Sequence, residues 1–66
     1  MSVVKVIEIM AESEKSWEDA ANVALKAAAK SVKNIKSIYI SDMQAIVEND
    51  KIVRYRVNAK LSFLVE

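Results

Sequence analysis

A strict alternation of apolar and polar residues over positions 51–66 constrains the fold of this chain most. The polar members include Arg54, Arg56 and Lys60, and the apolar members fall on every second position: Val53, Tyr55, Val57, Ala59, Leu61, Phe63 and Val65. Period two is typical of a β-strand, whose successive side chains point to opposite faces. A strand this long takes about a quarter of the chain, and it needs a cover for its apolar face and partners for its edges. We therefore expect the chain to associate with other copies of itself.

The length and composition lead to the same expectation. The 66 residues form one domain, residues 1–66, and a domain of this size buries only about 60% of the surface of its unfolded chain. Small domains are usually stabilised by disulfides, a structural metal or association, and the chain has neither cysteine nor histidine. Association remains, and the high hydrophobic content of 53% predicts that much apolar surface faces other subunits.

Charge and hydropathy narrow the range of partners. Ten Lys and Arg stand against nine Asp and Glu, so a net charge of +1 provides no field that attracts nucleic acid. No run approaches the roughly 20 apolar residues of a membrane span. The first ten residues carry Lys5 and Glu8 and lack the apolar core of a signal peptide. We predict a cytoplasmic protein that binds neither nucleic acid nor membranes.

The first half of the chain predicts a strand followed by a helix. Residues 3–10 are apolar and β-branched, which favours a strand buried on most of both faces. A short polar segment, residues 11–15, follows. Ser16 with Asp19 three residues later resembles a capping box that has Asp in place of Glu or Gln, so a helix is expected to begin there.

The predicted helix carries a narrow apolar stripe that consists mostly of alanine. Lysines such as Lys26 and Lys30 mark the opposite side, and the stripe itself runs through Trp17, Ala20, Ala21, Ala24, Leu25, Ala28 and Val32. We assign Trp17 to the core as the first apolar residue of this stripe. Because alanines let the helix lie close to the sheet, the last strand must supply the larger side chains, and we expect Val57, Leu61 and Phe63 to fill the space.

A second extended run covers residues 35–48, and its apolar pattern slips near Met43, which indicates a bulge. Asn49 and Asp50 then predict a tight hairpin, because both residue types tolerate positive φ. The order of elements is strand, helix, strand, strand, an α+β arrangement.

One face of the sheet stays uncovered, and a mixed face of isoleucines and basic residues suits a subunit interface or a ligand surface.

No catalytic motif is present, since histidine is absent and the serines have no sequence context for activation. We predict that the protein is not an enzyme. Four carboxylates around the helix start suggest either a divalent-ion cluster or a solvated loop, and a further three come together only if symmetry brings copies close. The two groups are Glu12, Glu14, Glu18 and Asp19, and Asp42, Glu48 and Asp50.

Three polar or aromatic residues of the last two strands are open to interpretation. Tyr39 lies on the same face as Ser37, where its ring either packs in an interface or meets a planar ligand. Arg54 and Arg56 are either solvated and paired with carboxylates of other subunits, or recognise a phosphate or carboxylate.

Three stretches in register resemble the dodecin family. They are residues 4–9 (VKVIEI), 16–21 (SWEDAA) and 55–63 (YRVNAKLSF), and the resemblance covers essentially the whole chain. It implies a β-α-β-β protomer in which a three-stranded antiparallel sheet wraps around one helix. It also implies a hollow homododecamer that stores or buffers a flavin such as FMN or riboflavin.

The resemblance also implies that the usual flavin contacts are replaced. Flavin-binding members stack the ring on a tryptophan early in the second strand and hydrogen-bond its edge with a glutamine in the third. Ser37 and Arg56 occupy those two positions here, and Tyr39 is a partial substitute for the missing ring. Related branches bind calcium or coenzyme A.

We therefore predict a non-enzymatic, dodecin-type, dodecameric protein that binds or stores a small ligand, with flavin binding of the usual kind weakened or lost. The proposed ligand-binding residues are Ser37, Tyr39 and Arg56, and no metal ligand is assigned. The alternatives are a shell that binds calcium or another metal, and a purely structural assembly.

Overall fold

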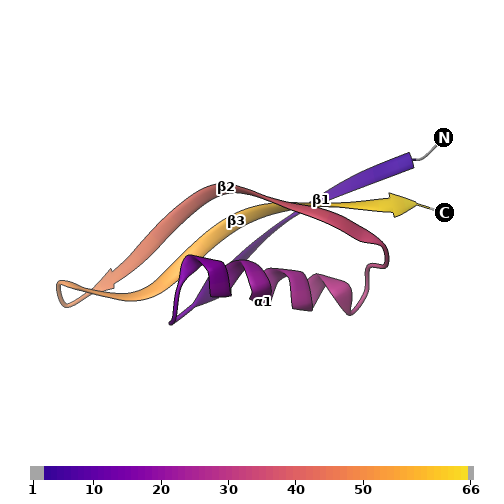
Figure 1. The fold of residues 1–66 in the computed structure, drawn as a ribbon. Helices are drawn as coiled ribbons and strands as arrows, with labels where there is room; N and C mark the ends of the chain where they lie inside the picture. Colours follow the sequence, from indigo (N-terminus) through magenta and orange to yellow (C-terminus); the bar gives the residue numbers. More distant parts are fainter. Residues whose placement is uncertain (1–2, 66) are drawn as a thin grey trace.

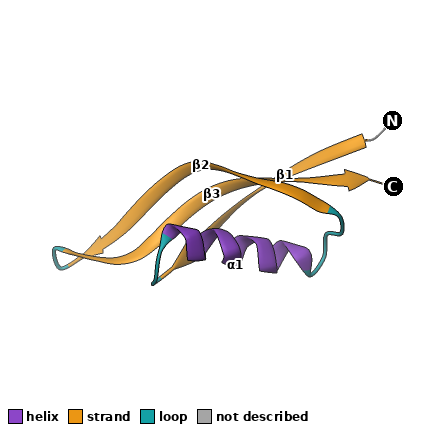
Figure 2. Cartoon of the chain, in the orientation of Figure 1, coloured by secondary structure: helices purple, strands orange, loops and turns teal. Residues whose placement is uncertain are grey.

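The computed structural model describes residues 3–65 and contains one helix and one sheet (Figures 1 and 2). Both sheet pairings are antiparallel, in the strand order β1-β3-β2, so β3 is the central strand and β1 and β2 are the edges. The sheet arches over the helix, which lies against one face only (Figure 1). The predicted β-α-β-β fold is confirmed. The elements are β1 (Val3–Ser13), α1 (Trp17–Ala29), β2 (Ile35–Glu48) and β3 (Lys51–Val65).

The start of α1 is fixed by local hydrogen bonds. The Ser16 hydroxyl accepts from the Asp19 backbone N–H at 2.9 Å, which confirms the predicted cap. The buried Ser13 hydroxyl donates to the Asp19 carboxylate at 2.6 Å. Asp19 therefore ties the end of β1 to the first turn of the helix.

Three residues with positive φ make the turns of this glycine-free chain. Asn34 has φ 63° between α1 and β2, and its carbonyl accepts from the Leu64 N–H at 3.1 Å. Asn49 and Asp50 have φ values of 52° and 62° in the β2–β3 hairpin, which confirms the predicted turn. The helix ends at Ala29, before the predicted stripe does, because the chain must turn toward Asn34.

The core is small and lies where α1 crosses the middle of β3. Alanines on the helix meet larger side chains on the strand, as the alternation predicts, and Val57 and Leu61 are almost fully buried. Phe63 is only half-buried, because it lies beyond the stretch that the helix covers best. The buried apolar residues are Ala20, Ala24, Ala28, Val57, Ala59 and Leu61.

The prediction for the first strand was wrong in two respects. β1 continues to Ser13 instead of ending at Met10, because it pairs with β3 as far as Tyr55. It is also not buried on both faces, since only one face meets the helix and the strand is an edge. Its exposed large apolar residues are Val3, Val4, Val6 and Met10.

The prediction that Trp17 belongs to the core was also wrong in this chain, since its side chain is 37% exposed. The indole N–H donates to the Gln44 carbonyl at 2.9 Å, and the ring packs edge-on against Tyr55 with centroids 4.9 Å apart. Trp17 therefore joins the helix start to the edge strand β2.

The bulge predicted near Met43 is found as a register shift between Ile40 and Asp42.

The β2–β3 hairpin extends beyond both β1 and α1 as a two-stranded ribbon (Figure 1). We call residues 46–54 the arm. The last pair between β1 and β3 joins Ser13 to Tyr55, and the contacts of Trp17 lie at the same level. An isolated two-stranded hairpin is marginally stable in water, so the arm depends on further contacts.

Candidate ligand face of the sheet

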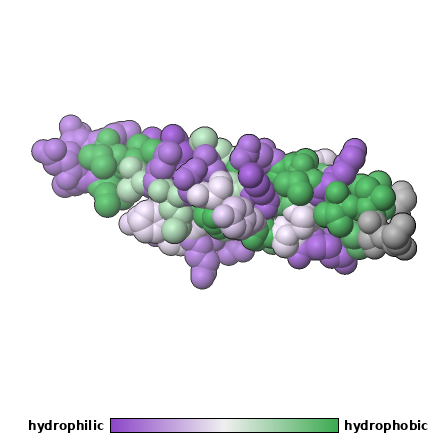
Figure 3. All heavy atoms as spheres, turned by 90° about the horizontal axis from the view of Figure 1, so that it is seen from above, coloured by the Kyte–Doolittle hydropathy of each residue, from purple (hydrophilic) through white to green (hydrophobic). Residues whose placement is uncertain are grey.

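The face of the sheet opposite α1 holds all three predicted ligand-binding residues. Cross-strand partners share a face, so the register defines this helix-free face. Figure 3 views the sheet from this side and shows polar and apolar atoms interleaved, with apolar atoms gathering toward the end where the termini lie. On the helix-free face, β1 contributes Val4, Val6, Glu8, Met10 and Glu12. Strand β2 contributes Ser37, Tyr39 and Gln44, and β3 contributes Arg54, Arg56, Asn58, Lys60, Ser62 and Leu64.

A network of charged side chains crosses this face near the base of the arm. Arg56 donates from Nε to Glu12 Oε2 at 2.6 Å, and its Nη2 forms a second ion pair with the same oxygen. Its Nη1 donates to Gln44 Oε1 at 3.4 Å. Arg54 lies 3.2 Å through Nε from Glu12 Oε1 and donates from Nη2 to Glu48 at 3.5 Å. The network therefore joins all three strands.

The arginines lower the pKa of the Glu12 carboxyl below its ordinary value. The hydrogen bond from Arg56 is the largest cause, and the positive charges of Arg56 and Arg54 act in the same direction, while desolvation opposes them. Two guanidinium groups face two carboxylates, those of Glu12 and Glu48. Both arginines thus have carboxylate partners within the chain, which argues against a phosphate site at Arg54 and Arg56 in a single copy.

Ser37 and Tyr39 lie toward the other end of the same face. The hydroxyl oxygens of Ser37 and Ser62 are 2.5 Å apart, so the two serines form a hydrogen bond. The Tyr39 side chain is 64% exposed and lies opposite Lys60 in the register. This region therefore offers hydroxyl groups and one exposed ring to a ligand or to another copy.

The structure does not bring Ser37 and Arg56 together within one chain. Ser37 pairs with Ser62, six residues beyond Arg56 along β3. At about 3.3 Å per residue, the two positions are about 20 Å apart. One small ligand can touch both positions only if they come from different copies.

The carboxylates at the helix start do not form a divalent-ion cluster, which was one of the two alternatives for this group. Glu12 faces the arginines on the helix-free face, whereas Asp19 bonds to Ser13 on the helix side. Across residues 3–65, no three His, Cys, Asp or Glu side chains are placed to hold a metal ion. Glu48 of the second acidic group is paired with Arg54. Within residues 3–65 of a single copy, these carboxylates are therefore dispersed.

Sequence reasoning missed the network of Glu12 with Arg54 and Arg56. The signal was present, because a strand that continued to Ser13 would have placed Glu12 directly opposite Arg56. The contact of Trp17 with Gln44 gave no such signal, since it depends on how the helix is oriented over the sheet. No helix within residues 3–65 has the length and apolarity that crossing a membrane requires.

Comparison with known proteins identifies the family. The family model for dodecin matches residues 3–66. The chain belongs to the dodecin family. Calcium dodecin from Mycobacterium tuberculosis is 36% identical over 63 residues, which cover 96% of this chain and 89% of that protein. These findings confirm the prediction of a dodecin-type ligand-binding protein.

Solved dodecin structures share the fold. The crystal structure of the Mycobacterium tuberculosis calcium dodecin, described as calcium chelating, has a TM-score of 0.86 at 34% identity and covers 98% of this chain and 93% of that one. Dodecin from Streptomyces coelicolor has a TM-score of 0.94 at 18% identity, with 98% and 93% covered. A Thermus thermophilus protein also reaches 0.94, at 23% identity with 100% and 97% covered. The latter two likenesses show the fold alone.

Proposed function

We propose that this dodecin is a non-enzymatic protein that assembles into a hollow homododecamer and holds a small ligand between its copies. One observation carries the proposal, namely the amount of apolar surface that the chain leaves uncovered. Eleven large apolar side chains within residues 3–65 are exposed, and they lie on both edge strands, on the helix, on the arm and at the end of β3. Large apolar patches exposed on a small protein are typical of surfaces that bind another protein.

The dimensions of the chain support self-assembly. Its Cα atoms span 51 × 20 × 13 Å with a radius of gyration of 13.5 Å, whereas a compact domain of this length has about 11 Å. It exposes 5024 Å² of surface, against about 4,200 Å² for a compact monomer of 7.4 kDa. The excess is comparable to the roughly 800 Å² that one partner buries in a standard interface.

The proposed ligand site is shared between copies. Along the helix-free face of one chain, Ser37 is about 20 Å from Arg56 and Tyr39 about 13 Å. A small ligand that contacts both Ser37 and Arg56 therefore lies where Ser37 and Tyr39 of one copy approach Arg56 of another. In such a site Tyr39 supplies an exposed ring and Ser37 a hydroxyl group, while Glu12 already holds Arg56.

We propose that flavin binding of the usual kind is weak in this protein. A serine provides no ring on which the flavin can stack, and Arg56 is held by Glu12 and Gln44 instead of presenting an amide. Stacking on an aromatic ring contributes about 0.5–1.5 kcal/mol beyond the buried area. Loss of that ring on two symmetry-related walls removes buried area as well.

Calcium is the second candidate ligand, because a relative of 36% identity is named calcium dodecin. Since the carboxylates of one copy are dispersed, a calcium site would need carboxylates from more than one copy. Asp42 and Asp50, both exposed, are two such candidates. The cytoplasmic location and the absence of nucleic-acid and membrane partners stay predictions.

The test uses one preparation and two titrations. Native mass spectrometry should first show a twelve-chain species, and a stable monomer would overturn the proposal. Titration with FMN should then leave most flavin fluorescence unquenched at micromolar concentrations. Calcium is titrated separately while the thermal midpoint is followed, because a ligand that binds only the folded protein raises it. Strong quenching by FMN would show that the usual flavin site persists.

A gain-of-function variant sharpens this test. Ser37→Trp combined with Arg56→Gln restores both usual flavin contacts, and we expect FMN to bind at least about tenfold more tightly than to the unaltered protein. Glu14→Gln, at an exposed site away from this face, is the matched control and should leave flavin binding unchanged. Unimproved binding in an intact dodecamer would contradict the assignment of Ser37 to the ligand site.

A further inference from the structure

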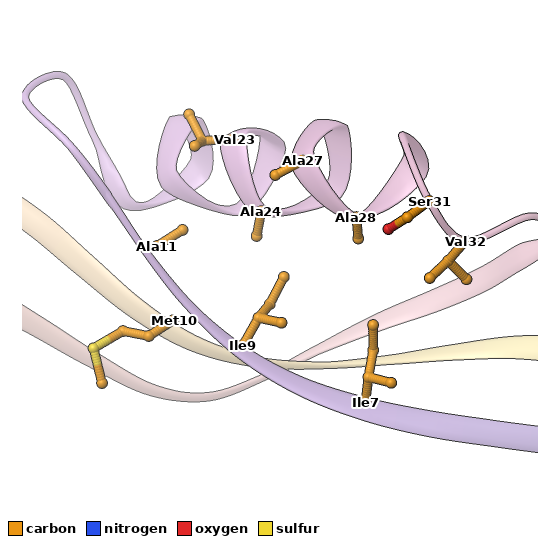
Figure 4. A pocket seen from close by; sticks show the side chains of 10 residues that line it. All are labelled: Ile7, Ile9, Met10, Ala11, Val23, Ala24, Ala27, Ala28, Ser31 and Val32. Carbon is orange, nitrogen blue, oxygen red and sulfur yellow. The ribbon is translucent and has the colours of Figure 1, made fainter.

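An apolar groove runs between β1 and α1 on the helix side of the molecule (Figure 4). Its volume is about 390 Å³. Ile7 and Ile9 point from β1 toward the helix, whereas Met10 points away (Figure 4). Ala24 and Ala28 form the opposite wall, and because their side chains are so small the groove is not filled by its own chain. Val23, on the outer side of the helix, is 43% exposed at its rim.

The arm, in contrast, carries apolar side chains that nothing else within residues 3–65 of the same chain covers. Val47 and Ile52 are paired across the hairpin and are 61% and 56% exposed. The arm extends past the last pair of β1 with β3 and past the contacts of Trp17, so nothing else in the described chain covers these two side chains (Figure 1). One chain thus carries an unfilled apolar groove and an uncovered apolar projection.

We propose that Val47 and Ile52 of one copy occupy the β1–α1 groove of another copy. Within one chain this contact is excluded, because the arm extends away from the helix. Between copies it is heterologous, since two different surfaces meet, and repetition of such a contact closes into a ring when the rotation permits. Each copy then inserts its arm into one neighbour and binds the arm of another. The groove and the apolar side chains of the arm are thereby both covered.

The charges near the two surfaces do not oppose the proposed contact between the arm and the groove. The base of the arm is neutralised internally, because Arg54 pairs with Glu12 and Glu48. The groove is lined almost entirely by apolar side chains, with Ser31 as its polar member. The groove lining therefore contributes no charged side chain that binding of the apolar pair would desolvate.

This inference rests on the proposed self-assembly, and the first test separates the two. The chain has no cysteine, so single cysteines can be introduced without background. Chains with Ile52→Cys and chains with Val23→Cys, carrying tags of different mass, are refolded together and oxidised. We expect a disulfide-linked dimer of the two chain types, because a disulfide needs Cα atoms within about 7 Å. Ile52→Cys mixed with Lys36→Cys, at the far end of the sheet, should give no such dimer.

A second variant tests the energetic role of the arm. Ile52→Asp places a charge on an exposed position, so the helix signal in circular dichroism should be preserved. We expect loss of the twelve-chain species at micromolar concentration, whereas Lys51→Asp, at a neighbouring exposed position, should leave it intact. An assembly that survives Ile52→Asp, or that forms without the 23–52 link, overturns this inference and leaves the proposed function standing. A wild-type chain that does not assemble overturns the proposed function itself.

Discussion

Two parts of the same strand, β3, differ sharply although their sequences alternate in the same way. In the middle of the strand, Val57, Ala59 and Leu61 are fully buried beneath the helix. In the arm, Val53 continues the same alternation but is only half-buried. The alternation thus determines which face a side chain occupies, whereas the position of α1 determines how deeply it is buried. The covered part stabilises the fold, and the arm is available to other copies.

The largest expected effect comes from removing the main side chain of the covered part. Leu61→Ala should destabilise the fold by about 2–5 kcal/mol, because it leaves a cavity beneath the helix. Denaturant unfolding at one fixed protein concentration measures it, since assembly makes stability depend on concentration. Val65→Ala, at a position that is 41% exposed near the strand end, should cost about 0.5 kcal/mol or less. If both substitutions lowered the stability equally, the covered part of β3 would not contribute more to the fold than the end of the strand.

The close approach of the helix is tested by enlarging one of its alanines. Ala20 is fully buried and does not line the β1–α1 groove, so Ala20→Leu should cost about 1–3 kcal/mol through overpacking. The same unfolding measurement applies. Ala29→Leu, on the exposed side of the last turn, is the matched control and should change stability by about 0.5 kcal/mol or less. A tolerated Ala20→Leu would show that the contact between helix and sheet is looser than the structure indicates.

The helix start lies where the covered part gives way to the arm. Ser16→Ala removes the acceptor for the Asp19 N–H and should cost about 0.5–2 kcal/mol. Thermal unfolding followed by circular dichroism measures the change. Ser16→Thr keeps a capping hydroxyl and should recover most of the loss. If Thr were no better than Ala, the cap would not be what fixes the start of α1.

The smallest effect at neutral pH is expected at the base of the arm. The pKa of Glu12 is lowered by Arg56 and Arg54, so the carboxylate favours folding above its unfolded-state pKa, and this contribution is lost as the pH falls through the lowered folded-state value. Glu12→Gln should therefore reduce the loss of stability on acidification. Midpoints of unfolding compared between neutral and acidic pH measure the difference. An unchanged pH dependence, equal to that of Glu14→Gln, would contradict the role of the network.

Local signals predicted most of the fold. Ser16 and Asp19 marked the helix start, Asn49 and Asp50 the hairpin, and the alternation the face of β3 that is buried. These features depend on residues close in sequence, so a single sequence reveals them. The family resemblance, on three short stretches, is confirmed by the match over residues 3–66.

The site was less predictable, because it depends on register and on distance. The sequence predicted that isoleucines of the second strand share the uncovered face with Arg56, and this was wrong. Ile38 and Ile40 pair with the buried Leu61 and Ala59 and face the helix, so Ser37 and Tyr39 are the β2 residues on the face of Arg56. The separation of Ser37 from Arg56 along β3 became measurable only with the cross-strand register. The exposure of Trp17 was missed for a similar reason, since the helical stripe gives its direction but not the distance at which the sheet curves away from the helix.

The contact between Trp17 and the Gln44 carbonyl makes the protein its own optical probe. The chain has a single tryptophan, and its indole lies at the junction of helix, edge strand and arm. Any event that bends the arm or frees that carbonyl changes the polarity and hydrogen bonding around the only strong ultraviolet emitter in each copy. Docking of neighbouring copies can thus be followed in real time, without attaching a dye.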